Sequence, residues 1–136
     1  MKKIVLGYDE SDAAKRALER AAQIAKAFDS ELIVTSVAPA MTSIGRSAGP
    51  VDPTDPPSAH IEELKHAQTY LEGEGLAADY VPALGHPADA IAQLAEERGA
   101  DLIVLGTHTT AIGRLLGQSV SESVAHKVHC DVLIVH

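Results

Sequence analysis

The chain has no tryptophan, a single phenylalanine and only three tyrosines among its 136 residues. Aromatic packing can therefore contribute little to the interior, although 46% of the residues are hydrophobic. A chain of this length can bury a substantial core as one domain, without disulfides or metals. We predict one domain over residues 1–136 with an aliphatic core of alanine, valine, isoleucine and leucine.

Cysteine is equally scarce, because Cys130 is the only one. A lone cysteine excludes an internal disulfide, and chains without disulfides are typical of reducing compartments. Its neighbours in sequence favour a packed, unreactive thiol over a redox centre. We therefore expect a cytoplasmic protein.

Basic residues are few: 11 lysines and arginines stand against 19 acidic residues, for a formal net charge of −8. Nonspecific nucleic-acid binding needs a concentrated basic surface, and no basic cluster here exceeds Lys2-Lys3. The N-terminal apolar run, residues 4–6, is too short for a signal peptide or a membrane span. We expect neither a nucleic acid nor a membrane as partner.

Short apolar runs do occur, and they alternate with helical patterns. The runs predict strands at residues 4–6, 32–37, 80–82, 102–105 and 132–135, and near-continuous apolar runs are typical of parallel strands covered on both faces. Pro82 indicates an end or edge position for the third strand. Apolar residues at helical spacing predict four helices, with buried faces at Ala14, Leu18, Ala21, Ile24, Ala25 and Phe28; Ile61, Leu64, Ala67 and Leu71; Ile91, Leu94 and Ala95; and Val120, Val124 and Val128. Five strands alternating with four helices predict a doubly wound α/β sheet.

Local signals mark where elements begin and where the chain is irregular. Ser11 is a plausible N-cap for the first helix, and Pro87 suits the first turn of the third. Ser119 and Glu122 form a capping-box pair before the fourth. Residues 39–57 are rich in proline, glycine and serine, and we expect a flexible loop there.

Four stretches, in order and with fitting spacing, resemble signatures of the universal stress protein family. They are Ile-Val-Leu-Gly-Tyr-Asp-Glu-Ser from residue 4, Gly-His-Pro-Ala-Asp-Ala-Ile from 85, Glu-Glu-Arg-Gly-Ala-Asp-Leu-Ile-Val-Leu-Gly from 96, and Asp-Val-Leu-Ile-Val from 131. The resemblance implies a five-stranded parallel sheet of the adenine nucleotide alpha hydrolase type, with strand order 3-2-1-4-5. It also implies a homodimer that pairs the last strands, residues 132–135.

The candidate site follows from the sheet and from the resemblance. In open α/β sheets, ligands lie outside the carboxyl ends of the strands where the connections diverge. The resemblance assigns contact with the nucleoside to Asp9, and a backbone contact with the adenine edge to Val37. A carboxylate suits ribose because it can accept hydrogen bonds from two hydroxyl groups. Asp9 is otherwise an ordinary turn or cap residue.

The phosphate loop of the nucleotide-binding members reads Gly, two residues, Gly, nine residues, Gly, then Ser or Thr. Glycines in such a loop let backbone N–H groups approach an anion at a helix N-terminus. Gly106 matches the first position, but Thr109 occupies the second. Gly117 comes two residues early and is followed by Gln118, so Ser119 fits the final hydroxyl only with a shortened loop. The phosphate loop is therefore altered, and helix capping alone can explain Ser119.

The resemblance also places Thr107 and His108 beside the phosphate and Val120 just after the final hydroxyl. A histidine on a loop is more often solvated or structural. Arg114 is the only lysine or arginine between residues 106 and 120. The negative charge of a triphosphate would therefore be poorly neutralised. No metal is expected beyond Mg²⁺ carried by a nucleotide, because no zinc signature appears.

Two functions stay open at this stage. The first is a small stress-response module that binds an adenine nucleotide, AMP or ATP. The second is a dimeric stress protein of the non-ATP-binding branch, which acts through protein contacts. Asp9, Gly106 and Ser119 favour the first, whereas Thr109 and Gln118 favour the second. We predict the first function, with AMP easier to accommodate than ATP, and no enzyme beyond slow incidental ATP hydrolysis, because no catalytic motif is present.

Overall fold

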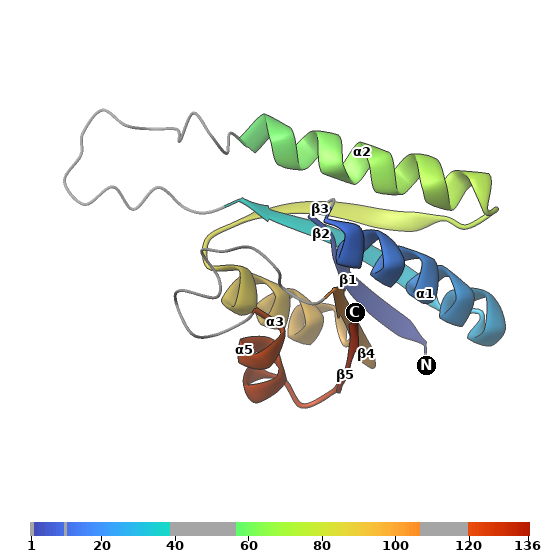
Figure 1. The fold of residues 1–136 in the computed structure, drawn as a ribbon. Helices are drawn as coiled ribbons and strands as arrows, with labels where there is room; N and C mark the ends of the chain where they lie inside the picture. Colours follow the sequence, from blue (N-terminus) through green and yellow to red (C-terminus); the bar gives the residue numbers. More distant parts are fainter. Residues whose placement is uncertain (1, 10, 39–56, 107–119) are drawn as a thin grey trace.

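Strands and helices alternate along the whole described chain (Figure 1). The computed structural model describes residues 2–9, 11–38, 57–106 and 120–136. Its elements are β1 (Lys3–Gly7), α1 (Asp12–Phe28), β2 (Glu31–Ala38), α2 (Pro57–Gly73), β3 (Ala78–Leu84), α3 (Pro87–Arg98), β4 (Leu102–Gly106), α5 (Val120–Lys127) and β5 (Asp131–Val135). The strands form one parallel sheet of order β3-β2-β1-β4-β5, which confirms the predicted fold class and strand order.

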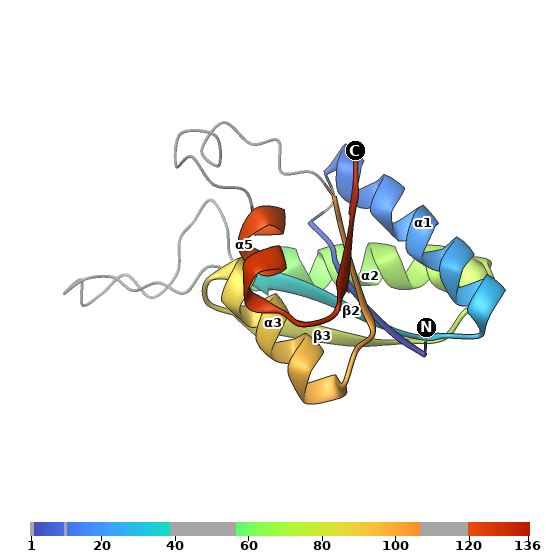
Figure 2. The ribbon, with the colours of Figure 1, turned by 90° about the horizontal axis from the view of Figure 1, so that it is seen from below.

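Helices cover both faces of the sheet, with α1 and α2 on one face and α3 and α5 on the other (Figures 1 and 2). Successive residues of a strand point to opposite faces. Ile4 and Leu6 of β1 accordingly join the core on the α1 and α2 side, and Val5 joins the core on the α3 and α5 side. Both cores are predominantly aliphatic, as the composition predicts.

The signals predicted for the starts of α1 and α3 are present in the structure. The Ser11 Oγ accepts a hydrogen bond from the N–H of Ala14 at 3.1 Å and caps α1. Pro87 lies in the first turn of α3, and Gly99 ends that helix in the left-handed conformation, with φ of 66°. β3 is an edge strand, as Pro82 indicated, but it extends to Ala78–Leu84. None of the described helices has the length and apolar character needed to cross a membrane.

Two side chains expected on buried helix faces are exposed instead. Phe28 is 60% exposed, because it is the last residue of α1 and the chain turns at Asp29 to reach β2. Ile61 is 48% exposed, because it lies on the flank of the α2 stripe formed by Leu64, Ala67 and Leu71. The loop predicted at 39–57 lies outside the described residues except for its last one, as does Ser119 of the predicted capping box.

Candidate functional site

The strand order creates a switch point between β1 and β4. From β1 the chain passes through α1 to β2 on one side, whereas β3 leads through α3 to β4 on the other. Such a divergence leaves a crevice outside the carboxyl ends of the strands. Gly7 pairs with both Thr35 and Leu105, so the ends of β2, β1 and β4 lie side by side.

Asp9 and Val37, two of the predicted site residues, both lie at this edge of the sheet. The N–H of Tyr8 still donates to the Thr35 carbonyl at 2.9 Å, so the pairing of β1 with β2 continues to their ends. Gly7 of β1 pairs with Thr35 of β2. Asp9 lies two residues after Gly7, and Val37 lies two residues after Thr35. The Asp9 side chain is exposed and that of Val37 is half-buried. The structure therefore places both residues just beyond the paired ends of adjacent strands.

Asp9 also has a local structural role. Its Oδ1 accepts a hydrogen bond from the N–H of Ser11 at 3.0 Å, which forms an Asx turn at the entry to α1. A carboxylate offers acceptor sites on both oxygens. The turn role and a contact with ribose hydroxyls are therefore compatible.

Gly106, the third predicted residue at this edge, has a packing reason to be glycine. A Cβ at this position would lie 2.6 Å from the Ala13 carbonyl carbon and 2.7 Å from the Ala14 nitrogen. The first turn of α1 therefore rests directly on the end of β4. A helix N-terminus carries partial positive charge that favours anions, but packing explains the absence of a side chain without any ligand.

The phosphate part of the predicted site rests on the sequence alone. For Val120, only its place as the first residue of α5 is described. The other predicted residues lie outside the described chain: Thr107, His108, Thr109, Gly117 and Ser119.

Sequence reasoning missed a buried polar pair on the α2 side of this edge. The Ser36 Oγ donates a hydrogen bond to the Glu63 Oε1 at 3.1 Å. Ser36 directly precedes Val37 in the sequence. Ser36 and Glu63 are both at least nine-tenths buried. The available signals were a serine that interrupts an apolar strand and a glutamate four residues before the buried Ala67.

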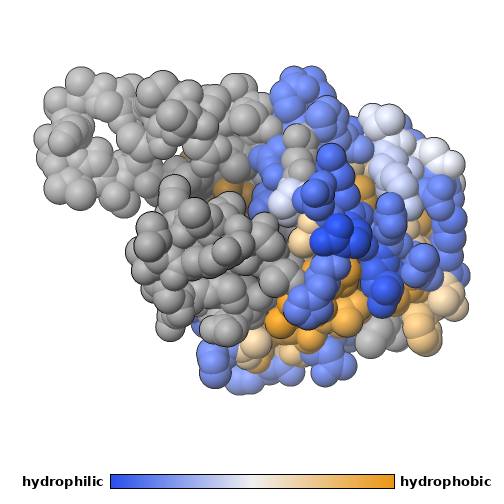
Figure 3. Space-filling model, viewed as in Figure 1, coloured by the Kyte–Doolittle hydropathy of each residue, from blue (hydrophilic) through white to orange (hydrophobic). Residues whose placement is uncertain are grey.

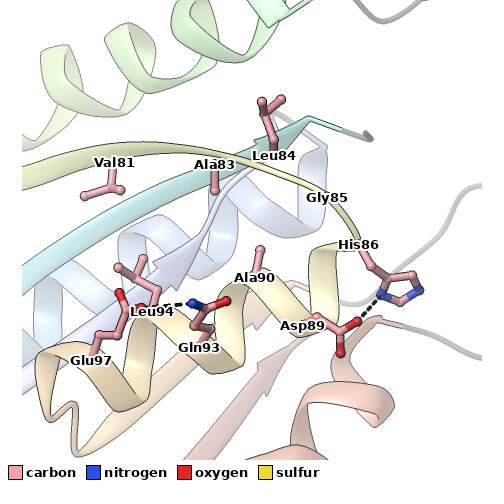
Figure 4. Close-up of a pocket in the computed structure, with 10 residues that line it drawn as sticks. All are labelled: Val81, Ala83, Leu84, Gly85, His86, Asp89, Ala90, Gln93, Leu94 and Glu97. Atoms are coloured by element: carbon pink, nitrogen blue, oxygen red, sulfur yellow. Dashed lines mark hydrogen bonds and ion pairs between the residues drawn. The ribbon is translucent and has the colours of Figure 1, made fainter. Parts of the chain in front are cut away.

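A separate hollow of about 350 Å³ lies between β3 and α3 (Figure 4). None of the described site candidates lines it. At its end, Asp89 pairs with His86 at 4.0 Å and with Lys127 at 2.9 Å, and the hydrogen bond from Lys127 lowers the pKa of Asp89. The exposed pair of Asp89 with Lys127 connects α3 with the end of α5, whereas the contact with His86 is local to the start of α3. The described residues contain no group of three His, Cys, Asp or Glu side chains suited to a metal ion.

Cys130 is a free, half-buried thiol just before β5. Burial raises the pKa of the Cys130 thiol above its usual range. Because the thiolate is the nucleophile, we expect alkylation by iodoacetamide at pH 7 to be about tenfold slower than that of glutathione. The rate should increase with pH beyond 9, and a rate at pH 7 equal to that of glutathione would contradict the packed-thiol interpretation.

Over its full length the sequence is similar to universal stress proteins. The sequence model of the universal stress protein family matches residues 1–136. The universal stress protein Rv1636 of Mycobacterium tuberculosis is 39% identical over 142 residues, which cover 99% of this chain and 96% of the relative.

Solved structures show the same similarity. A universal stress protein in complex with cAMP has a TM-score of 0.75 and 35% identity, and the match covers 99% of this chain and 97% of that one. A universal stress protein from Archaeoglobus fulgidus has a TM-score of 0.78 and 26% identity, over 100% and 94% of the two chains. The two matches cover nearly the full length of this chain and of each solved structure.

Proposed function

We propose that this chain, which belongs to the universal stress protein family, binds an adenine nucleotide at the carboxyl edge of its sheet as a small regulatory module. One observation carries the proposal: the ends of β2, β1 and β4 lie side by side, and Asp9 and Val37 each follow the paired end of β1 or β2 by two residues. The relative in complex with cAMP supports an adenine nucleotide as the ligand class.

Each part of the nucleotide meets a suitable group at this edge. The Asp9 carboxylate accepts hydrogen bonds from ribose hydroxyls. The backbone N–H and C=O of Val37 complement the adenine edge, which carries both an acceptor and a donor. The phosphate lies toward the N-terminal ends of α1 and α5, where backbone N–H groups attract anions.

A single phosphate suits the chain better than a triphosphate. Thr109 stands where the binding members have glycine, and its branched Cβ disfavours a positive φ. Arg114 is the only cation in the same stretch, so little positive charge is available. We therefore propose AMP or a cyclic monophosphate as the preferred ligand, bound without dedicated catalysis.

Calorimetric titration with AMP, cAMP and ATP tests the proposed binding. We expect saturable binding of one AMP per chain in the micromolar range, with ATP bound more weakly. No heat of binding for any of the three at millimolar concentration would contradict the proposal and favour the ligand-free function.

We also propose that two copies of the chain pair through β5. This edge strand carries Val132, Leu133 and Ile134, which are all half-buried in the single chain. Figure 3 shows hydrophobic surface gathered over the region of β5, between hydrophilic surfaces. Among the described strands β5 pairs with β4 alone, and an edge strand with apolar side chains is a template for pairing with a second chain. This observation equally supports the second candidate function, a dimeric stress protein that acts through protein contacts.

Replacing Val132 by lysine should raise the dimer dissociation constant about tenfold, because an ammonium group at the interface loses water without a partner. Sedimentation velocity over a range of concentrations measures this change. Val81→Lys is the matched control, since Val81 is a half-buried valine on β3, the opposite edge strand. An unchanged mass for Val132→Lys, or an equal loss in both variants, would count against pairing through β5.

A further inference from the structure

We propose that Ser36 and Glu63 are positioning residues that hold the end of β2 and thereby set which base the nucleotide site accepts. This inference rests on the proposed nucleotide function, and it assigns base specificity to two residues that do not themselves contact the base. We call them the Ser36–Glu63 pair.

The sheet holds the end of β2 on one side only. Val37 and Ala38 pair with β3, which is itself an edge strand, whereas the pairing of β2 with β1 ends at Thr35. Side chains alternate between the faces, so Thr35 and Val37 face the α3 side while Ser36 faces α2. Ser36 is therefore the side chain through which α2 can hold this part of the strand.

Glu63 is an unusual residue for its position on α2. It lies on the buried stripe of the helix beside Leu64 and before Ala67, and only 9% of it is exposed. Burial of a carboxylate is strongly unfavourable unless the group is hydrogen-bonded. The hydrogen bond from the Ser36 hydroxyl joins residues 27 positions apart in sequence and ties α2 to the end of β2.

This tie adds to the pairing of Val37 with Ala83 of β3, because a single peptide bond separates Val37 from Ser36. Hydrogen bonds from the Val37 backbone to a base require donor–acceptor distances of about 2.7–3.2 Å. A shift of about 1 Å at this residue is enough to lose them. Asp9 follows β1 and not β2, so the contact with ribose should be unaffected. Loss of the pair should therefore change base preference rather than affinity for nucleotides in general.

Comparing the affinities for AMP and GMP measures this base preference. Adenine presents a donor at N6 where guanine presents an acceptor at O6, so the two edges demand opposite backbone groups. A site that forms hydrogen bonds with the adenine edge rejects the guanine edge, because the polar groups of the site are then left without partners.

Calorimetric titration of AMP and GMP into the full chain and its variants tests the inference. We expect Ser36→Ala and Glu63→Leu each to reduce the preference for AMP over GMP about fivefold, through weaker AMP binding. Glu63→Gln should keep most of the preference, because the amide oxygen can still accept from Ser36. Ser36→Cys, with a weak donor of similar size, replaces Ser36→Ala if the latter does not fold.

Gln68→Ala is the matched control, because it breaks a hydrogen bond of 3.1 Å to Glu72 on the exposed face of the same helix. This variant should leave the preference unchanged. If the Ser36 and Glu63 variants bind AMP and GMP more weakly by the same factor, the pair has a general structural role. That result would overturn this inference but not the proposed function. A wild-type protein that binds neither nucleotide would overturn the proposed function and the inference with it.

Discussion

Replacing Gly106 by alanine is expected to lower the free energy of unfolding by about 2–3 kcal/mol. The added Cβ would lie 2.6 Å from the carbonyl carbon of Ala13 and 2.7 Å from the nitrogen of Ala14. Both are backbone atoms and cannot rotate away, so the first turn of α1 or the end of β4 must move. Urea denaturation of wild type and variant measures the difference.

Gly73→Ala is the control for this substitution. Gly73 is the last residue of α2, and a Cβ there meets no atom within 4 Å. Alanine in a helix is favoured over glycine, so the control should be neutral or slightly stabilising. A Gly106→Ala protein as stable as wild type would show that α1 does not rest on this strand end. The glycine would then need a ligand to explain it.

Replacing Asp9 by alanine should weaken AMP binding about 10- to 100-fold. The reason is the loss of charge-assisted hydrogen bonds to ribose hydroxyls, worth about 1.5–3 kcal/mol together, and 1.4 kcal/mol corresponds to a factor of ten. Calorimetric titration gives the affinity, and urea denaturation of the same variant shows whether loss of the Ser11 turn destabilises the fold.

Two further variants separate the ligand role of Asp9 from its turn role. Asp9→Asn retains an acceptor for the Ser11 N–H but removes the charge, and it should still lose about tenfold in affinity. Asp12→Asn removes an exposed charge from the first turn of α1 and should have no effect. An Asp9→Asn protein with wild-type affinity would identify Asp9 as a turn residue only.

The fold was largely predictable because its signals are local. Ser11 and Pro87 mark helix starts through backbone constraints that need no tertiary context. The predicted burial of Phe28 and Ile61 was wrong, because helical periodicity identifies the buried face of a helix but not where the sheet that covers it ends. Strand order came from the family resemblance, since alternation of strands and helices does not determine which strands are neighbours.

The edge of the sheet where the strands end was predictable from the sequence, whereas contacts between distant segments were not. Asp9 and Val37 follow apolar runs whose ends must meet at one edge of a parallel sheet. Gly106 was interpreted as a phosphate residue, because its approach to Ala13 joins segments far apart in the sequence. Glu63 was missed, because counting apolar residues on a helix overlooks a carboxylate on its buried face.

A crystal structure of the protein grown with AMP tests the central claim most directly. We expect ordered nucleotide at the carboxyl edge of the sheet, with the ribose hydroxyls within hydrogen-bond distance of the Asp9 carboxylate and the adenine edge against the Val37 backbone. A nucleotide bound elsewhere, such as in the hollow between β3 and α3, or an empty carboxyl edge at saturating AMP, would contradict the claim.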